Sequence, residues 1–468
     1  MDIPCSFRHI FMDAACHLSV TRGDSSIDRQ YIGNSYRKRE MENVLKIDDF
    51  KAAPADGPAF RPQTVAEVGV RLSVLEDLAL KILYLSGPFS ILELSKLTRL
   101  SYEVANELFL RLRTELLCQV TGMANNIPNI AITSQGRTRA MELLSLSHYT
   151  GPAPVSLEQY VEQVKKQSVK NVVVRPADVE RAFAHLVLDD KTLWQLGTAL
   201  NSGSSLFLYG PAGTGKTTIA ETLTRVIAED DVWLPYAVEV ESQFITIYDP
   251  AIHNRVAEDE PENHDERWVL CNRPAVLVGG ELTVEMLDLE FNPLTKYYVG
   301  PLQMKANNGV LIIDDFGRQR LRPEELLNRW IVPLDRRIDF LTLAGGKKIE
   351  VPFEMLVVFA SNLDPFELVD PAFLRRIQTK IKVGELTDEQ FREIFRRVAA
   401  DRGIKGESGI VDNLIGIIKG TLKQELRACF PRDIINQICW AARYEGKKPY
   451  LDRASLIQAV EAYFLAKS

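Results

Sequence analysis

Hydrophobic residues recur at helical spacing in three parts of segment 72–117, and two short runs of strand type follow. Gly87-Pro88 separates the first predicted helix from the second, and Ser101 is a suitable N-cap for the third. A further helix is predicted from Ser134 to Leu146. The positions that carry these predictions are Leu75, Leu78, Ala79, Ile82 and Leu83; 91–97; Val104, Leu108, Leu112 and Leu116; 118–121; and 130–133.

The order helix, helix, helix, hairpin, helix, with a turn at 122–128, resembles a winged-helix module. Such modules often bind DNA, which requires a basic surplus on the third helix. The predicted exposed side of that helix has mixed charges, which favours protein docking or a structural role over DNA binding. Its residues are Glu103, Asn106, Glu107, Arg111, Arg113 and Glu115.

Composition shifts divide the rest of the chain. Residues 1–65 are polar and irregular, so we expect disorder there, and translation could begin at Met1 or at Met41. Residues 149–154 are rich in Pro and Gly and predict a linker, and helices are expected over 156–170, 175–188 and 190–200. The expected domains are a disordered segment (1–65), a winged-helix-like domain (66–148), a linker and helix (149–175), an α/β nucleotide-binding domain with inserts (176–385) and a helical lid (386–468).

A phosphate-binding loop is the clearest chemical pattern in the chain. An apolar strand is predicted over 205–209, the pattern G-x-x-x-x-G-K-[ST] follows it, and a helix start comes next. The loop's backbone N–H groups and the helix N-terminus bind phosphate oxygens, Lys216 should reach the β- and γ-phosphates, and the Thr217 hydroxyl should ligate Mg²⁺. The predicted nucleotide-binding residues here are Gly210, Pro211, Ala212, Gly213, Thr214, Gly215, Lys216, Thr217 and Thr218.

A second apolar strand, 309–313, ends in two carboxylates and fits a Walker B element. Asp314 should belong to the Mg²⁺ shell, and Asp315 should position or deprotonate the attacking water. Asp315 stands where many such ATPases have Glu, and its side chain is one methylene shorter. Hydrolysis could therefore be slow or could depend on closure by a neighbour.

A third apolar strand ends at Asn362 and is followed by Asp370-Pro371-Ala372-Phe373-Leu374-Arg375-Arg376 and Pro431-Arg432-Asp433. From residue 176 onwards this order resembles the AAA+ ATPases. The resemblance implies an α/β P-loop core with a parallel sheet and a helical lid, here with four helices from a Thr387 N-cap. It also implies ATP and Mg²⁺ as ligands and a homo-oligomeric ring, expected to be a hexamer. It assigns Asn362 as sensor 1, Arg375 and Arg376 to the arginine finger, and Arg432 as sensor 2.

Two additions resemble the MoxR-like branch, whose members act as chaperone-like remodellers. One is the long stretch 237–303, with predicted strands 268–271 and 274–280 around a turn, and the other is a hairpin over 339–351. Segment 308–333 resembles uncharacterised bacterial AAA ATPases with an N-terminal winged helix, some of which have names linked to chaperone activity and Flp pilus assembly.

Composition sets limits on the alternatives. The net charge is −7, the apolar runs are too short to span a bilayer, and the six cysteines form no C-x-x-C pair, which together fit a cytoplasmic protein without membrane insertion, disulfide framework or zinc site. We expect the acidic residues 258–262, Asp265 and Glu266 to form a solvated loop rather than a cation site.

Three hypotheses remain open from the sequence. The first is an ATPase ring that remodels an unknown protein client, recruited by the winged helix and contacted by the inserts. The second is an ATPase that acts on nucleic acid, which the acidic net charge and the absence of a G-A-F-T-G-A loop disfavour. The third is a pseudo-ATPase that binds ATP only as a switch.

Overall fold

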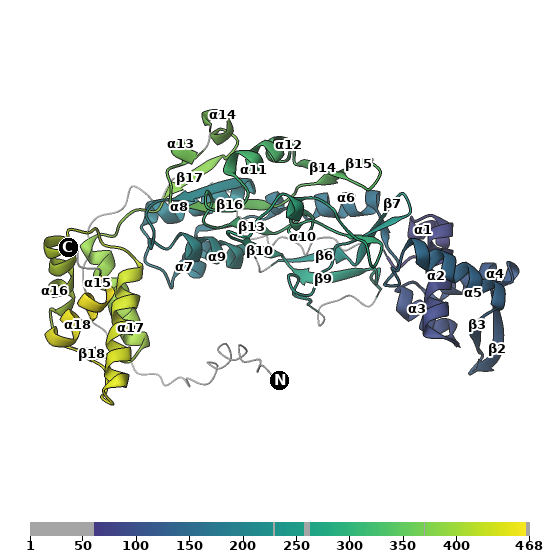
Figure 1. Ribbon diagram of the computed structural model, residues 1–468, viewed down its shortest axis with the longest axis horizontal. Coiled ribbons are helices and arrows are strands. Elements are labelled where there is room, and N and C mark those ends of the chain that lie inside the picture. The colour runs from purple at the N-terminus through teal and green to yellow at the C-terminus, as the bar shows by residue number, and fades with distance from the viewer. Residues whose placement is uncertain (1–59, 228–229, 257–262, 369, 465–468) are drawn as a thin grey trace, which may run out of the picture. The chain divides into compact units, whose positions relative to one another are not determined.

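The computed structural model describes residues 60–464, except 228–229, 257–262 and 369 (Figure 1). Most of the N-terminal segment predicted to be disordered, the alternative start at Met41 and the acidic residues 258–262 therefore lie outside the described residues. No helix in the described part of the chain is both long and apolar enough to cross a membrane.

A five-stranded parallel sheet lies at the centre of the chain, in the order β10-β13-β16-β5-β17. The inner strands β13, β16 and β5 are almost continuously apolar because both faces of the sheet are covered there. The predicted α/β class with a parallel sheet is confirmed. The strands are β5 (Ser205–Tyr209), β10 (Ala275–Val278), β13 (Val310–Ile313), β16 (Leu356–Ser361) and β17 (Thr379–Lys382).

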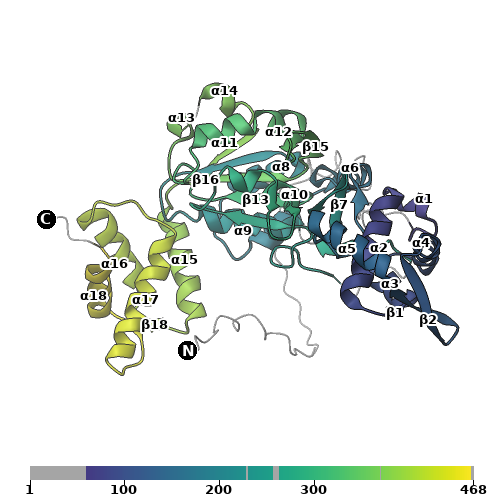
Figure 2. The same cartoon turned by 45° about the vertical axis from the view of Figure 1, so that its right-hand side comes forward.

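Alternate side chains of β5 point to two different hydrophobic cores. Leu206 and Leu208 pack with α7, α8 and α9, whereas Phe207 packs with Leu327 and Trp330 from the α11–α12 segment. Figure 1 shows α7 and α9 on one side of β13 and β16, with α11 and α12 on the other, and Figure 2 shows the same arrangement for α9, α11 and α12. The helices are α7 (Pro176–Phe183), α8 (Asp190–Ser202), α9 (Lys216–Ile227), α10 (Leu302–Lys305), α11 (Pro323–Arg329), α12 (Ile331–Arg336), α13 (Pro365–Leu368) and α14 (Pro371–Leu374).

The long stretch 237–303 contributes to a second sheet, β11-β12-β8-β7-β4. The strands predicted around a turn at 268–280 exist, but the hairpin is wrong: β9 pairs with β6, and β10 joins the central sheet. Arg273, between them, is buried and donates to the carbonyls of Gln167 and Asn308, so the chain crosses there from one sheet to another. The strands are β4 (Val155–Ser156), β6 (Asp231–Pro235), β7 (Ala237–Val240), β8 (Gln243–Thr246), β9 (Trp268–Asn272), β11 (Glu290–Asn292) and β12 (Tyr297–Val299), with the short helices α6 (Leu157–Lys166), η2 (Val169–Asn171) and η4 (Glu285–Leu287).

The hairpin predicted over 339–351 is confirmed. Strands β14 (Ile338–Thr342) and β15 (Lys348–Pro352) pair antiparallel. Gly345 and Gly346, in the connecting turn, have φ values of 99° and 85°, which glycine adopts without the steric cost of a Cβ.

The N-terminal module, residues 65–146, has the predicted order of helices and hairpin. The hairpin turn is shorter than predicted, because Asn125 and Asn126 adopt left-handed conformations that allow a two-residue turn. Leu116 was expected on the buried face of the third helix, but that helix ends at Thr114 and Leu116 is exposed. The elements are α1 (Val65–Val68), α2 (Leu72–Ser86), β1 (Phe89–Ser90), α3 (Ile91–Thr98), α4 (Tyr102–Thr114), β2 (Cys118–Ala124), β3 (Ile127–Ile132) and α5 (Ser134–Leu146).

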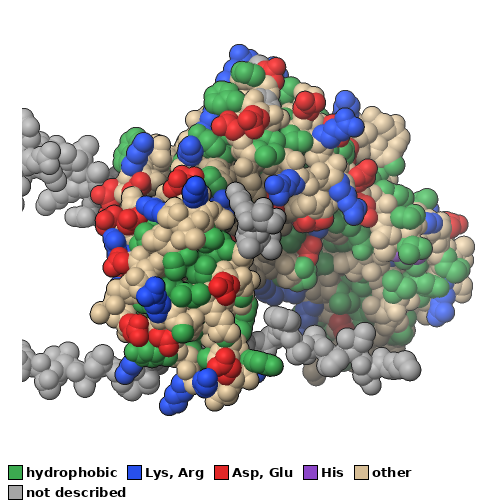
Figure 3. All heavy atoms as spheres, turned by 60° about the vertical axis from the view of Figure 1, so that its left-hand side comes forward, with side chains coloured by type: hydrophobic (Ala, Val, Ile, Leu, Met, Phe, Trp, Pro, Cys, Tyr) green, Lys and Arg blue, Asp and Glu red, His purple; other side chains and the backbone are tan. Residues whose placement is uncertain are grey.

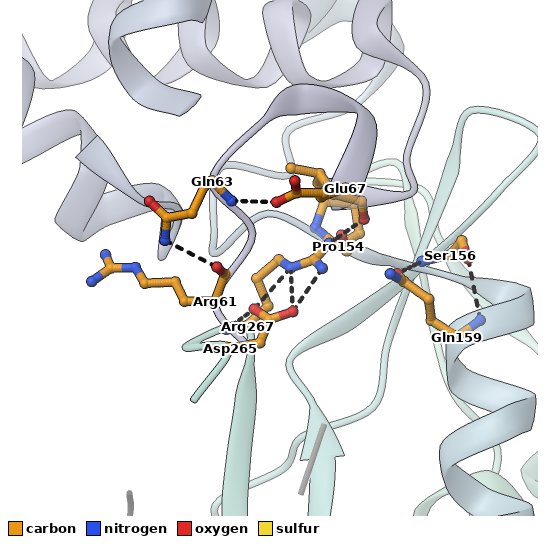
Figure 4. A network of polar contacts seen from close by, with 9 residues as sticks. Arg61, Gln63, Glu67, Pro154, Ser156, Gln159, Asp265 and Arg267 are labelled. Atoms are coloured by element: carbon orange, nitrogen blue, oxygen red, sulfur yellow. Dashed lines mark hydrogen bonds and ion pairs between the residues drawn. The ribbon is translucent and has the colours of Figure 1, made fainter. Parts of the chain in front are cut away.

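The loop before β9 contacts this module through a buried arginine that is paired with a carboxylate of the same loop. Arg267 is 1% exposed, binds Asp265 with an Nη2–Oδ2 distance of 2.7 Å, and donates Nη1 to the carbonyls of Val68 and Pro154 (Figure 4). The expectation that Asp265 belongs to a solvated loop is therefore wrong, because a guanidinium with three buried acceptors needs a carboxylate beside it. Phe244 of β8 also stacks on Tyr149, with 4.7 Å between ring centroids.

Lys81 of α2 lies in the same interface and predicts a pH-dependent stability. Burial lowers the pKa of Lys81 to about 8, although its ammonium donates to the Ser147 carbonyl and lies 5.2 Å from the Phe244 ring centroid. A pKa lowered in the folded state means that the unfolded state binds more protons between pH 8 and 10.5, so stability should rise with pH across that window. We expect Lys81→Met to be more stable than wild type by about 1–2 kcal/mol at pH 7, with the difference shrinking towards pH 10.

Thermal unfolding followed by circular dichroism between pH 7 and 9.5 measures this effect. Lys96→Met is the matched control, because Lys96 is exposed on α3 of the same module and should give no pH-dependent gain. A Lys81→Met variant that parallels wild type at every pH would contradict the prediction.

Four α-helices form the described part of the C-terminal region. The capping box predicted at its start is present, since Thr387 accepts from the Gln390 backbone N–H and the Gln390 side chain accepts in return. On the face drawn in Figure 3, basic and acidic side chains are interspersed. The elements are α15 (Asp388–Asp401), β18 (Lys405–Gly406), α16 (Ile410–Gly416), a π-helical turn η5 (Ile417–Thr421), α17 (Cys429–Tyr444), β19 (Tyr450–Leu451) and α18 (Arg453–Tyr463).

Candidate functional site

The phosphate-binding loop connects the end of β5 to the start of α9, as predicted. Gly213 and Gly215 have φ values of 81° and 95°, a region that side chains rarely adopt, and this lets successive N–H groups turn towards one point. The Thr214 hydroxyl donates to the Pro211 carbonyl at 3.0 Å and closes the loop on itself. The Gly213 carbonyl accepts from the N–H of Cys429 at 3.0 Å, so the first turn of α17 contacts the loop.

Lys216 is directed into the site rather than to solvent. Its side-chain ammonium donates to the carbonyls of Gly210 and Pro211, at 3.0 and 2.8 Å, and to Asn362 Oδ1 at 2.7 Å. Burial lowers the pKa of Lys216, and the nearby Asp314 and Asp315 act in the opposite direction. A cation with three donors is thus held between the loop and the end of β16.

Asp314 and Thr217 form the second group of the site. Asp314 directly follows β13, and its Oδ2 accepts from the Thr217 hydroxyl at 2.8 Å. A carboxylate and a hydroxyl are hard oxygen donors of the kind that Mg²⁺ prefers, and Mg²⁺ is commonly held by one such carboxylate plus substrate phosphates. The predicted pair therefore fits a magnesium ion beside the phosphate-binding loop.

Asp315 and Asn362 form the third group. The Asn362 amide donates Nδ2 to Asp315 Oδ1 at 2.9 Å, while its Oδ1 accepts from Lys216. Asp315 itself is exposed and has a left-handed backbone, with φ 49°. Asn362 thus links the phosphate-binding lysine to the carboxylate predicted to act on water.

The three predicted arginines lie in different surroundings. Arg375 is exposed at the end of α14, whereas Arg376 is half-buried and its Nε lies 2.9 Å from Asp335 Oδ2. Arg432 is exposed in the first turns of α17, and its Nε contacts the neighbouring Asp433 at 3.0 Å. Thr218 is exposed on α9. The assignment of these four residues to the nucleotide site stays a prediction.

Two residues of this site have no counterpart in the sequence prediction. The Gln319 side chain donates to the Asp314 carbonyl and accepts from the Gly317 N–H, and the Ser361 hydroxyl donates to the Phe316 carbonyl. Neither belongs to a recognisable motif. The only signal for Gln319 and Ser361 in the sequence is that they lie within a few positions of Asp315 and Asn362 along the chain.

The pattern of donors and acceptors is that of a site for nucleotide phosphates. Backbone N–H groups, a helix N-terminus and a buried ammonium bind anions. Beside them lie the Thr217–Asp314 pair, whose oxygens fit a metal ion, and an exposed carboxylate that can accept a proton. In the described part of the chain, no group of three or more His, Cys, Asp or Glu side chains forms another metal site.

Comparisons with known proteins give one family match. Residues 387–462 match a domain of unknown function, DUF8689. This match covers the C-terminal helices and less than half of the chain. No curated protein matches the sequence.

Solved structures show similarity of low degree. NtrX from Brucella abortus in complex with ADP is 13% identical, with a TM-score of 0.37, over 62% of this chain and 60% of that one. This chain thus spans less than two thirds of the length of NtrX. The Thermotoga maritima RuvB Holliday junction branch migration motor is 14% identical, with a TM-score of 0.33, over 66% of this chain and 71% of that one. Because both TM-scores are below 0.5, the functional assignment rests on the chain's own side chains.

Proposed function

We propose that this protein is an AAA+-type ATPase that hydrolyses ATP to ADP and phosphate and uses the energy to remodel a protein client. The contact that carries the proposal is the Lys216–Asn362–Asp315 chain beside the Thr217–Asp314 pair. It brings a phosphate-binding cation, a polar amide and a carboxylate to the end of the same sheet. A protein that only binds ATP as a switch does not require this carboxylate.

Each residue has a role in this mechanism. Loop N–H groups and Lys216 bind the β- and γ-phosphates, and Lys216 exchanges its bond to Asn362 for phosphate oxygens. Thr217 and Asp314 would hold Mg²⁺, which would neutralise charge that develops on the phosphoryl oxygens. Asn362 orients the attacking water, and Asp315 accepts its proton. Arg375 stabilises the γ-phosphoryl charge of a neighbouring subunit in a ring, and Arg432 contacts the nucleotide from the C-terminal helices.

The remodelling part of the proposal rests on the winged-helix-like arrangement of the N-terminal module and on its charge. The arrangement alone equally fits DNA binding. The exposed side of α4 carries acidic and basic residues, with Glu107 and Arg111 bonded to each other at 3.0 Å. Phosphate binding needs an unpaired basic surface, so a protein client fits this helix better than a nucleic acid.

Release of phosphate from ATP, measured with wild type and Asp314→Ala at concentrations that assemble oligomers, tests the enzymatic claim. We expect turnover by wild type and loss of turnover in the variant. No turnover by wild type would leave a nucleotide-binding switch. For the client class, a gel shift with random duplex DNA should show no salt-sensitive binding in the micromolar range, and such binding would favour the nucleic-acid alternative.

A further inference from the structure

The two carboxylates of the site lie on a tight turn, residues 314–319, here called the carboxylate turn. Asp315 and Gly317 both have left-handed backbones, with φ values of 49° and 102°. A side chain at Gly317 would collide with Leu368, whose Cδ2 would lie 2.6 Å from the added Cβ. The turn thus has an unusual conformation that other residues must hold in place.

Gln319 spans this turn with one side chain. Its Nε2 donates to the carbonyl oxygen of Asp314 at 2.8 Å, and its Oε1 accepts from the backbone N–H of Gly317 at 2.8 Å. Both polar ends of the amide are therefore satisfied by the backbone on either side of Asp315. The partly buried position of Gln319 limits competition from water for these bonds.

Ser361 holds the opposite side of the turn. Its hydroxyl donates to the Phe316 carbonyl at 2.6 Å and accepts from the Leu363 N–H at 3.1 Å, and the side chain is fully buried. The N–H of Phe316 also donates to the Ala360 carbonyl at 2.7 Å. The carboxylate turn is thereby bonded to Ala360 and Ser361, the two residues directly before Asn362.

We propose that Gln319 is a positioning residue for the ATPase reaction, acting through the backbone of Asp314 and Asp315. The proposal rests on the proposed function. The carboxylate of Asp315 is one methylene shorter than that of Glu, so it reaches Asn362 only if its backbone lies close to that amide. The left-handed conformation of Asp315 brings its backbone close to the Asn362 amide. Gln319 maintains this conformation by bonding to the Asp314 carbonyl and to the Gly317 N–H, on either side of Asp315. A displacement of about 1 Å at a reacting group costs about 100-fold in rate.

The decisive variant is Gln319→Met, which keeps the length of the side chain and removes both hydrogen bonds. We expect kcat to fall about 10- to 100-fold, with KM for ATP changed less than about threefold. Affinity for a fluorescent ATP analogue in EDTA should equal that of wild type, because the phosphate-binding loop and Lys216 are untouched. Affinity for Mn²⁺ in the presence of a non-hydrolysable ATP analogue, followed by electron paramagnetic resonance, should fall several-fold because Asp314 is less well placed.

Two further variants complete the experiment. Gln319→Glu keeps the acceptor for the Gly317 N–H and loses the donor to Asp314, so its kcat should lie between those of wild type and Gln319→Met. Gln378→Met is the control, since Gln378 is exposed and outside the turn, and it should behave as wild type.

The outcomes separate this inference from the proposed function. Wild-type kcat and wild-type Mn²⁺ affinity in Gln319→Met would overturn the inference and leave the ATPase intact. No turnover by wild type would overturn the proposed function, and the Mn²⁺ titration would still decide whether Gln319 places Asp314. If Gln319→Met lowers both the melting temperature and the affinity for the ATP analogue in EDTA, Gln319 has a folding role and the inference is overturned. If Gln319→Met does not fold, Gln319→Glu decides by the same measurements.

Discussion

Lys216→Ala is expected to lower the affinity for ATP at least about 100-fold, because each charge-assisted hydrogen bond to phosphate is worth about 1.5–3 kcal/mol. The ammonium of Lys216 donates to three acceptors, two of them carbonyls of the loop itself. The substitution therefore removes a phosphate ligand, two bonds within the loop and the bond that joins the loop to the residue after β16. Titration with a fluorescent ATP analogue, in EDTA and in Mg²⁺, measures the loss.

Lys191→Ala is the matched control for that experiment. Lys191 is exposed on α8 and should leave the affinity unchanged. Lys216→Arg should restore little of the ATP affinity, because a planar guanidinium does not fit a site shaped for a compact ammonium. ATP affinity in Lys216→Ala equal to that of wild type would refute the assignment of the loop.

The parts of the site that could be predicted from the sequence are those encoded locally. The phosphate-binding loop needs glycines at fixed spacing after a strand, and the buried strands show as continuous apolar runs. Asp314 and Asn362 could be placed because each directly follows such a strand, and the carboxyl ends of parallel strands meet at one edge of the sheet.

Contacts between distant residues could not be predicted in this way. Lys216 and Asn362 are 146 positions apart, and their hydrogen bond depends on the order of strands in the sheet. The side chain of Gln319 bonds only to backbone groups, which leave no sequence signal. Likewise, Asp265 stands in an acidic stretch that predicts a solvated loop, yet it is buried with Arg267, which donates to the Val68 carbonyl of the N-terminal module.

Arg375 and Arg376 show how packing separates neighbours that the sequence treats alike. Arg376 is bonded to Asp335 on the same subunit, and its side chain is 15% exposed. Arg375 is exposed beside it. If one of the two reaches the nucleotide of another subunit, the exposed residue can do so without breaking an ion pair.

Arg375→Ala is therefore expected to lower turnover about 1,000-fold while ATP affinity stays at the wild-type level, since a finger that acts in trans stabilises only the transition state. Arg376→Ala is the matched comparison, and we expect it to retain most of the turnover and to lose at most about 1 kcal/mol of stability from the ion pair with Asp335. Steady-state phosphate release and a nucleotide titration on each variant provide both quantities.

Mixing the Arg375→Ala variant with Asp315→Ala subunits tests whether the arginine acts between subunits. Each variant alone lacks one half of every site, because one cannot supply the arginine and the other cannot accept the proton of water. In a mixed ring, some interfaces contain an intact Asp315 on one side and an intact Arg375 on the other, so turnover should recover to a measurable fraction of wild type. If the two variants assemble into mixed rings and these rings remain inactive, Arg375 acts within its own subunit. Full turnover by Arg375→Ala alone would exclude Arg375 as the finger.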